Sequence, residues 1–163
     1  MKRIASFGID HTRLQRGMYL SREDGDVLTW DIRMKEPNRG DYLSQGALHT
    51  LEHLFATWAR NSRYGAGVIY IGPMGCRTGM YFLTRGLTPE EALDCVRESY
   101  RFMASFEGAV PGATEAECGN WKEHDPEGCR REARAFLPVL EGLRAEDLHY
   151  TWYLDPADDA ERG

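Results

Sequence analysis

Apolar and polar residues alternate along one stretch of the chain, and two later stretches are rich in β-branched and aromatic residues; both patterns predict β-strands. In the clearest stretch, 27–34, every second residue is apolar: Leu28, Trp30, Ile32 and Met34. The Asp24-Gly25 pair just before it predicts a hairpin turn. The stretches 67–71 and 78–85 are rich in Val, Ile, Tyr and Phe and predict a second strand pair, joined by a loop at 72–77.

Apolar residues spaced three and four positions apart predict helices farther along the chain. Ser44 is a suitable N-cap for a helix that ends near residue 60. The apolar stripe of this helix consists of Ala47, Leu51, Leu54 and Trp58. Thr88 and Glu91 match a capping box, with Pro89 at the first helical position. They predict a second helix that extends to about residue 106.

Two more helices are expected in the last third of the chain. Thr114 and Glu117 repeat the capping-box pattern and predict a short helix that carries Cys118. Near a helix N-terminus, the helix dipole would favour the thiolate form of this cysteine. The Asp125-Pro126 pair then predicts the start of a last helix, which extends to about residue 143.

The order of these elements predicts an α+β fold, in which helices cover one face of an antiparallel β-sheet. Neither a repeat nor a linker-like segment interrupts the sequence, so we expect a single domain over residues 1–163. The acidic tail from about residue 155 has few apolar residues, and we expect it to be mobile. A sheet face that helices leave open would need a partner, which makes a homodimer the expected assembly.

Composition and charge favour a protein that acts on a small molecule. The 163 residues are 42% hydrophobic and 28% charged, which is ordinary for a globular domain. The net charge of −6 and the lack of a basic run argue against a nucleic-acid partner. We expect no membrane association and a cytoplasmic location, because neither a bilayer-spanning apolar run nor a signal peptide is present. The four cysteines are too irregularly spaced for a disulfide framework.

The segment 49–53 (HTLEH) carries the most specific chemical signal. On a helix, His49 and His53 lie about 40° apart, so both imidazoles face one side and could bind one metal ion. Glu52 lies about 60° away, close enough to reach a substrate without being a ligand. The alternative is a pair of solvated histidines, but Arg60 is the only charged residue on their helix face. That composition favours the metal site.

Two histidines do not complete a catalytic metal site, which usually has three protein ligands and one open position. The candidates for the third ligand are Cys118, His124, His11, Cys76 and the carboxylates. Spacing alone does not choose between Cys118 and Cys76. Cys95 and Cys129 fall within predicted helices, and we expect both to be packing residues.

Three motifs, in this order and spacing, resemble the S-ribosylhomocysteine lyase (LuxS) family. They are HTLEH at 49–53, PMGCRTG at 73–79 and ECG at 117–119. The segments 6–11, 31–33, 37–38 and 124–125 also resemble this family, so the similarity covers about residues 5 to 140. Three motifs together are far more specific than the first motif alone.

The resemblance implies an α+β homodimer, similar in fold to metallopeptidases, with two active sites at the subunit interface. It implies cleavage of S-ribosylhomocysteine to homocysteine and 4,5-dihydroxy-2,3-pentanedione, the precursor of autoinducer-2, by carbonyl migration and β-elimination. It also implies one divalent metal ion per subunit, typically Fe²⁺, with Zn²⁺ or Co²⁺ as substitutes. The implied metal ligands are His49, His53 and Cys118. The implied acid/base pair is Cys76 and Glu52, and the implied substrate-binding residues are Ser6, His11 and Arg33.

Two other functions fit parts of the pattern. A metallopeptidase with the inverted order H-x-x-E-H would use Glu52 to activate water, but it needs a downstream glutamate ligand and usually a longer chain. A non-catalytic metal-binding protein would close the site with a fourth ligand, for which Cys76 is a candidate. The cysteine in the third motif argues against the peptidase.

Overall fold

A four-stranded antiparallel sheet forms the centre of the protein in the computed structural model, which describes residues 4 and 7–155. The strands are β1 (Gly17–Asp24), β2 (Val27–Arg33), β3 (Val68–Pro73) and β4 (Gly79–Arg85). Their order in the sheet is β1-β2-β4-β3, so the two hairpins lie side by side. The tail that we expect to be mobile begins at about residue 155, and positions 156–163 lie outside the described residues.

The predicted turn at Asp24-Gly25 and the predicted second strand pair are confirmed. Gly25 has a φ of 63° in the first turn, a left-handed conformation that glycine adopts without a steric penalty. The alternation in 27–34 correctly gave β2, whereas its partner β1 was not predicted. The second half of β1, from Arg22 to Asp24, is polar and exposed, so the alternation there is lost.

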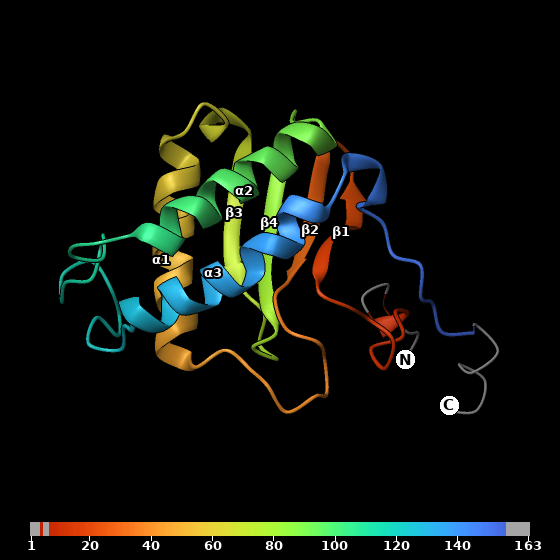
Figure 1. The fold of residues 1–163 in the computed structure, drawn as a ribbon. Coiled ribbons are helices and arrows are strands. Elements are labelled where there is room, and N and C mark those ends of the chain that lie inside the picture. The colour runs from red at the N-terminus through yellow and green to blue at the C-terminus, as the bar shows by residue number, and fades with distance from the viewer. Residues whose placement is uncertain (1–3, 5–6, 156–163) are drawn as a thin grey trace.

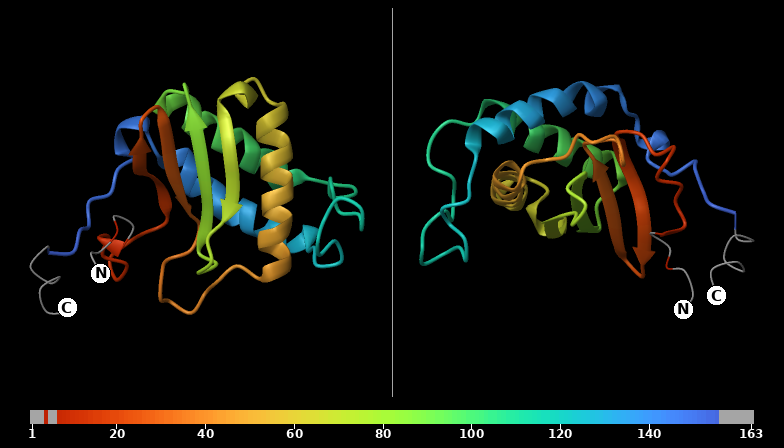
Figure 2. Two further views of the ribbon diagram at one scale, coloured as in Figure 1. Left: turned by 180° about the vertical axis from the view of Figure 1, so that it is seen from behind. Right: turned by 90° about the horizontal axis from the view of Figure 1, so that it is seen from below.

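Three long helices pack beside and across the sheet: α1 (Gln45–Asn61), α2 (Pro89–Ser105) and α3 (Pro126–Gly142). Helices α2 and α3 cross one face, and α1 runs beside β3 (Figure 1). From behind, the opposite face of the sheet is free of helices (Figure 2). The predicted α+β fold with helices on one face is therefore confirmed. Among the described residues, no helix is both long and apolar enough to cross a lipid bilayer.

The main core fills the space between the sheet and its helices. Trp30 is fully buried there, and its indole N–H donates to Thr84 Oγ1 at 2.9 Å, which satisfies the buried polar group. Cys95 and Cys129 are buried packing residues, as expected. Of the stripe predicted for α1, Trp58 alone is only half-buried, because it packs against the margin of the core.

The two capping-box patterns have different outcomes. At the start of α2, Thr88 Oγ1 accepts the Glu91 N–H and the Glu91 carboxylate accepts the Thr88 N–H, as predicted. At Thr114, the hydroxyl instead donates to the Glu117 carboxylate at 2.7 Å, and the backbone makes turns rather than a helix. The predicted short helix at Cys118 is wrong, because the polar, glycine-containing residues that follow offer no apolar face to pack.

We expect Thr88→Ala to lower the free energy of unfolding by about 1 kcal/mol, because the mutation removes the acceptor of an N-cap hydrogen bond. The matched control is Thr114→Ala, which removes the same side chain from a similar sequence that caps no helix. Its expected effect is below about 0.5 kcal/mol. Urea unfolding followed by circular dichroism measures both changes. Equal losses in the two variants would contradict the assigned difference.

A second, smaller apolar cluster lies on the sheet face that α2 and α3 leave open. Met18 and Tyr19 are neighbours on β1 and point to opposite faces, so Met18 joins the main core and Tyr19 the second cluster. Its other members come from both ends of the described chain: Ile9, Leu14 and Tyr150, with Trp152 against them. The N- and C-terminal segments therefore share one packing site.

Candidate functional site

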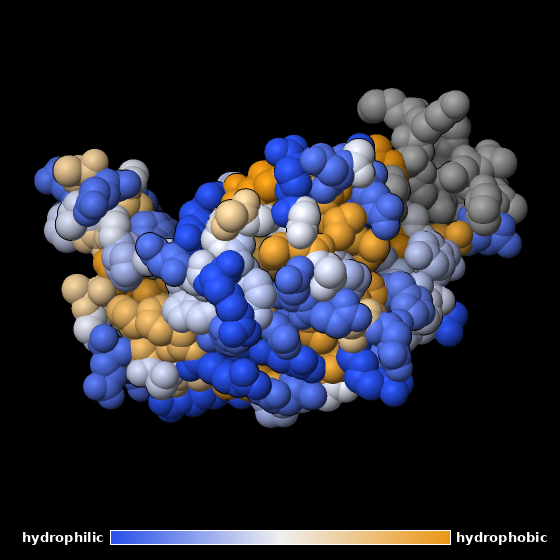
Figure 3. Space-filling model, turned by 90° about the horizontal axis from the view of Figure 1, so that it is seen from above, coloured by the Kyte–Doolittle hydropathy of each residue, from blue (hydrophilic) through white to orange (hydrophobic). Residues whose placement is uncertain are grey.

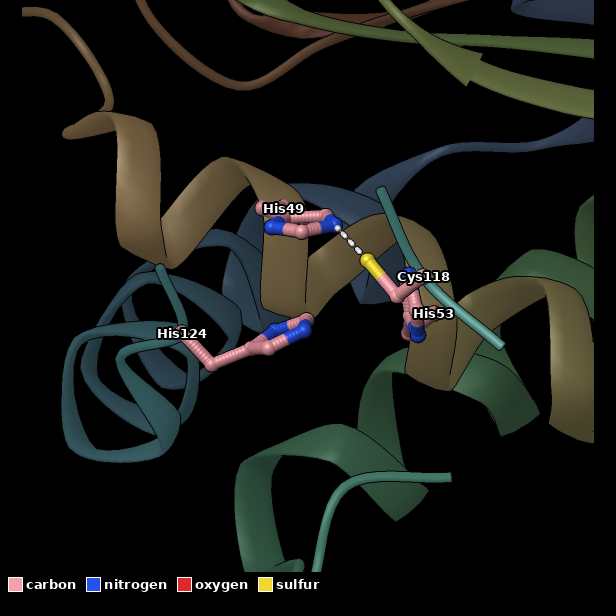
Figure 4. Close-up of side chains that lie close together, drawn as sticks. All are labelled: His49, His53, Cys118 and His124. Carbon is pink, nitrogen blue, oxygen red and sulfur yellow. Dashed lines mark hydrogen bonds between the residues drawn. The ribbon is translucent and has the colours of Figure 1, made fainter. Parts of the chain in front are cut away.

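Four potential metal ligands converge beside α1. They are His49 and His53 of α1, Cys118 of the loop before α3, and His124 directly before α3. Each offers one ligand atom, and these atoms lie within 4.8 Å of one another (Figure 4). The predicted pairing of the two α1 histidines is confirmed, because their rings lie 4.7 Å apart on one face of the helix. Of the candidates left open by spacing, Cys118 joins this cluster and Cys76 does not.

Backbone carbonyl groups orient the rings of both α1 histidines. His49 Nδ1 lies 2.9 Å from the Glu123 carbonyl oxygen, and His53 Nδ1 lies 2.8 Å from that of Pro111. A carbonyl oxygen only accepts, so each Nδ1 carries the proton and each Nε2 keeps a free lone pair. Metal-binding histidines are typically held in this way, because the carbonyl oxygen fixes the tautomer and the orientation of the ring.

The loop that reaches His53 depends on a glycine. Gly112 has a φ of 71°, and a Cβ there would lie 3.3 Å from His53 Nδ1. This left-handed residue turns the chain just after Pro111, whose carbonyl group accepts from His53. The backbone conformation of this loop therefore fixes the position of the His53 ring.

His124 has the same tautomer as the other two histidines, for a different reason. Its Nδ1 lies 3.2 Å from Thr50 Oγ1, whose only proton is already donated to the Gly46 carbonyl oxygen at 2.8 Å. The hydroxyl must therefore accept from His124, which leaves Nε2 with the lone pair. This Nε2 is buried and has no hydrogen-bond partner, and the ring stacks on His49 at 4.0 Å.

The charge state of His124 also suits metal binding. Burial lowers the pKa of His124, and charge on His49 or His53 lowers it further. A neutral imidazole is the form that donates a lone pair to a metal ion. His124 was one of several candidates in the sequence, and the family resemblance did not include it among the ligands.

Cys118 reaches the cluster from an irregular loop. Its Sγ lies 3.3 Å from His49 Nε2, and its N–H bonds to the Thr114 carbonyl oxygen in a single turn. The helix predicted at Cys118 is not formed, so the prediction that a helix dipole favours the Cys118 thiolate is wrong. A histidine and cysteine donor set of this kind fits Zn²⁺ or Fe²⁺ better than Mg²⁺ or Ca²⁺, which prefer oxygen.

Cys76 lies in a separate cavity at the end of the β3–β4 hairpin. The cavity has a volume of about 390 Å³, and its lining includes His11, Arg33, Cys76 and Thr78. None of the four residues of the metal cluster lines it. Within one chain, the metal cluster therefore lies outside the cavity of the thiol.

The groups around Cys76 favour its thiolate. Burial raises the pKa of the thiol, but hydrogen bonds from Thr78 and the positive charge of Arg33 outweigh this, and the net shift is downward. Cys76 Sγ lies 3.0 Å from Thr78 Oγ1 and 3.8 Å from an Arg33 nitrogen. Thr78, which was not among the predicted site residues, also accepts from Arg33 at 2.6 Å. The feature of the sequence that could have identified Thr78 is its position two residues after Cys76.

Three of the four remaining predicted site residues are among the described residues. Glu52 is half-buried on α1 beside His53. His11 and Arg33 lie with Cys76 in the lining of the same cavity. Ser6 lies outside the described residues.

Comparison with known proteins gives the family. The model of the S-ribosylhomocysteinase (LuxS) family matches residues 4–145. A relative from Phocaeicola vulgatus is 50% identical over 157 residues, covering 92% of this chain and 98% of its own length. Relatives from Porphyromonas gingivalis and Clostridium acetobutylicum are 46% and 40% identical, each covering 92% of this chain and 99% of their own length. All three are described as S-ribosylhomocysteine lyases. This chain belongs to the S-ribosylhomocysteinase (LuxS) family.

Proposed function

We propose that this protein is an S-ribosylhomocysteine lyase, which releases homocysteine and forms 4,5-dihydroxy-2,3-pentanedione. The observation that supports this most directly is the pairing of two kinds of site. One is a histidine and cysteine cluster that suits a divalent metal, and the other is a cavity with a thiol of lowered pKa. The relatives that cover 92% of this chain carry the same name.

We propose His49, His53 and Cys118 as ligands of one divalent ion per subunit, with Fe²⁺ as the preferred metal and Zn²⁺ or Co²⁺ as substitutes. The oriented Nε2 lone pairs and the nearby thiol support this set. When bound, the ion supplies a Lewis acid that stabilises the negative charge of an enolate.

We place His124 beside these ligands as a group that contacts the substrate. A catalytic metal site needs one position that protein ligands leave open, and four protein ligands would close it. His124 faces the same point with an unpartnered Nε2, so a substrate hydroxyl that enters there could donate to it. The same observation favours the second alternative, a non-catalytic metal-binding protein with a closed site.

The peptidase alternative loses its main support. Within the described part of the chain, no carboxylate belongs to the metal cluster, and a peptidase of the inverted type needs a glutamate ligand. In the third motif of this chain, at 117–119, it is Cys118 that joins the cluster, not a glutamate.

The reaction assigns a proton-transfer task to Cys76 and Glu52. The sugar carbonyl starts at the end of the ribose chain far from the thioether, so it must migrate by two enolisations before β-elimination becomes possible. Each enolisation removes a proton from carbon and adds one elsewhere, which requires a positioned base and acid. We assign proton removal from carbon to the Cys76 thiolate, and proton exchange between the sugar oxygens to Glu52.

We assign substrate binding to Arg33, His11 and Ser6. Arg33 and His11 line the cavity of Cys76, which supports their role in holding the ribose hydroxyls near the thiolate. Arg33 has a second effect, because its positive charge favours the ionised thiol. The assignment of Ser6 rests on the family resemblance alone.

We propose a homodimer in which Cys76 of one subunit faces the metal centre of the other. Two features support it: the thiol cavity contains none of the cluster residues, and one face of the sheet has no helix over it. Large apolar side chains remain exposed, including Tyr70 and Tyr81 of β3 and β4, and apolar patches are visible among the polar ones in Figure 3. We also propose a cytoplasmic location, since all four cysteines are free thiols.

The decisive test is release of a thiol from S-ribosylhomocysteine. Reduced protein loaded with Fe²⁺ or Co²⁺ is expected to release homocysteine, which a thiol reagent detects, because the cleaved thioether leaves as a thiol. The control substrate is S-ribosylhomocysteine whose aldehyde has been reduced to an alcohol, since it has no carbonyl to migrate. If the true substrate releases no more thiol than it does with metal-free protein, the proposed function is wrong.

A further inference from the structure

The last described segment of the chain returns to the N-terminal segment. The Leu20 N–H bonds to the Leu148 carbonyl oxygen at 2.8 Å, and the Asp10 N–H bonds to that of Trp152 at 3.1 Å. The Leu154 N–H donates to the Gly8 carbonyl oxygen at 2.8 Å. We call residues 148–154 the C-terminal strap. It lies beyond residues 4–145, which match the family model.

Tyr150 is the residue of the strap that reaches the sheet. Its ring is buried and stacks on Tyr19 of β1, with ring centroids 4.7 Å apart. Its hydroxyl donates to the Asp31 carboxylate of β2. Burial raises the pKa of Tyr150, and the negative charge of Asp31 raises it further, so the phenol keeps its proton.

Asp31 connects Tyr150 to the thiol site. The Asp31 oxygen that accepts from Tyr150 also accepts from Arg33 at 3.3 Å. Both members of this ion pair are more than nine-tenths buried, and Asp31 Oδ1 and Arg33 Nε have no partner of their own. A buried ion pair with so few partners depends strongly on each hydrogen bond it has.

The other end of Arg33 determines the environment of the thiol. One terminal nitrogen donates to Thr78 Oγ1 at 2.6 Å and lies 3.8 Å from Cys76 Sγ. The guanidinium is planar and rigid, so its hold on Asp31 fixes the direction in which this nitrogen points. An unbroken chain of contacts therefore runs from Tyr150 through Asp31 and Arg33 to Cys76.

We propose that Tyr150 is a positioning residue for the Cys76 site, which holds Asp31, and through it Arg33, in the orientation that places the guanidinium against the thiol. The inference rests on the proposed function of Cys76 as the base. It gives the C-terminal strap a role in the reaction, because Tyr150 of the strap positions the guanidinium beside the reacting thiol.

Other ionisable groups surround the thiol, and none of the three named here has a hydrogen bond to Tyr150. Tyr81 of β4 is near Cys76, and its pKa is raised by burial and by Asp31. His11 and Arg77 line the cavity. Because Tyr150→Phe replaces none of these three residues, an altered titration of Cys76 reports on the Asp31–Arg33 pair.

The test is the pH dependence of Cys76 alkylation by iodoacetamide, measured by mass spectrometry of the Cys76 peptide in metal-loaded protein. In Tyr150→Phe we expect the midpoint to rise by about half a pH unit, because the guanidinium is held less firmly against the thiolate. We expect kcat to fall about three- to tenfold. The matched control is Tyr19→Phe, whose lost hydroxyl donates only to the Gln15 carbonyl oxygen. It should keep the wild-type midpoint.

A double-mutant cycle separates positioning from general destabilisation. If Tyr150 acts through Asp31, Tyr150→Phe should shift the midpoint in the wild type but not in an Asp31→Asn background. An equal shift in both backgrounds, or none in the wild type, overturns the proposal. Should Tyr150→Phe fail to fold, Asp31→Glu provides the second test, since it keeps the charge but moves the carboxylate, and the same rise is expected. Alkylation needs no substrate, so this result stands apart from the lyase assay.

Discussion

Cys76→Ala is expected to lower kcat for thiol release by about 10²–10⁴-fold while the metal content stays at the wild-type level. This range is what a positioned acid or base contributes to a reaction that moves protons. The metal content should not change, because Cys76 lies outside the cluster formed by His49, His53, Cys118 and His124. Metal analysis and steady-state kinetics on the same preparation measure both quantities.

The role of Cys76 also predicts how alkylation of its thiol and turnover of the wild-type protein depend on pH. The pKa of Cys76 is lowered from its ordinary value, so the thiolate forms at a lower pH than in an unperturbed cysteine. Alkylation of Cys76 should therefore reach half its maximal rate at a lower pH than alkylation of a free cysteine, and turnover should rise over the same range. Arg33→Gln should move the alkylation midpoint upward, because it removes the positive charge beside the thiol. A midpoint at or above that of a free thiol would contradict the role of Cys76.

A mixed dimer tests where the thiol acts. Cys76→Ala keeps the metal ligands, and Cys118→Ala keeps the thiol, so each homodimer should be inactive. If Cys76 serves the metal centre of the partner, a dimer of one subunit of each kind contains one intact site. Coexpression of the two in equal amounts should then restore about a quarter of the wild-type turnover. If both groups come from the same subunit, no dimer has an intact site and activity stays absent.

Cys118→Ala is expected to lose the bound metal, whereas His124→Gln is expected to retain it. Cys118 offers a thiolate within 3.3 Å of His49 Nε2, and removing one of three ligands should weaken metal binding by more than about 100-fold. In His124→Gln the ligand set that we propose is intact. Its turnover should still fall by about tenfold or more, because a group that contacts the substrate is altered.

The measurement is a titration of metal-free protein with Co²⁺, followed by its visible absorption. A site with three protein ligands and one open position should give the same cobalt spectrum and stoichiometry in wild type and His124→Gln. If His124→Gln loses metal as Cys118→Ala does, the site is closed by four protein ligands, and the non-catalytic metal-binding function is favoured instead. His149→Gln is a matched control, since this histidine is not part of the cluster.

The elements that the sequence predicted well depend on local interactions. The spacing of His49 and His53 on one helix and the cap at Thr88 follow from contacts between residues a few positions apart. The alternation in β2 is visible within the strand itself, although β1 and β4 hold the strand in the sheet. The Asp24-Gly25 turn belongs to the same class. These features depend on backbone geometry that near neighbours determine, so the pattern of the chain is enough to predict them.

The errors have equally local causes. The pattern at Thr114 satisfied the rule for a capping box, yet no apolar face follows it to pack against the core, and turns form instead. The strand β1 was missed because its polar half is held by pairing with β2 rather than by burial. A strand held in this way has no signature in its own sequence.

By itself, the sequence predicted the helix with its two histidines, the Asp24-Gly25 turn, the second strand pair, the family resemblance and the candidates for the reactive residues. Only the tertiary structure brings Cys118, which the resemblance implied as a ligand, into the cluster and leaves Cys76 outside it. It also places His124 at the same point and brings Tyr150 to Asp31. The physical reason is separation along the chain. Residues 49 and 124, or 31 and 150, meet only after the helices and the strap have packed on the sheet. No local period or spacing encodes such a meeting.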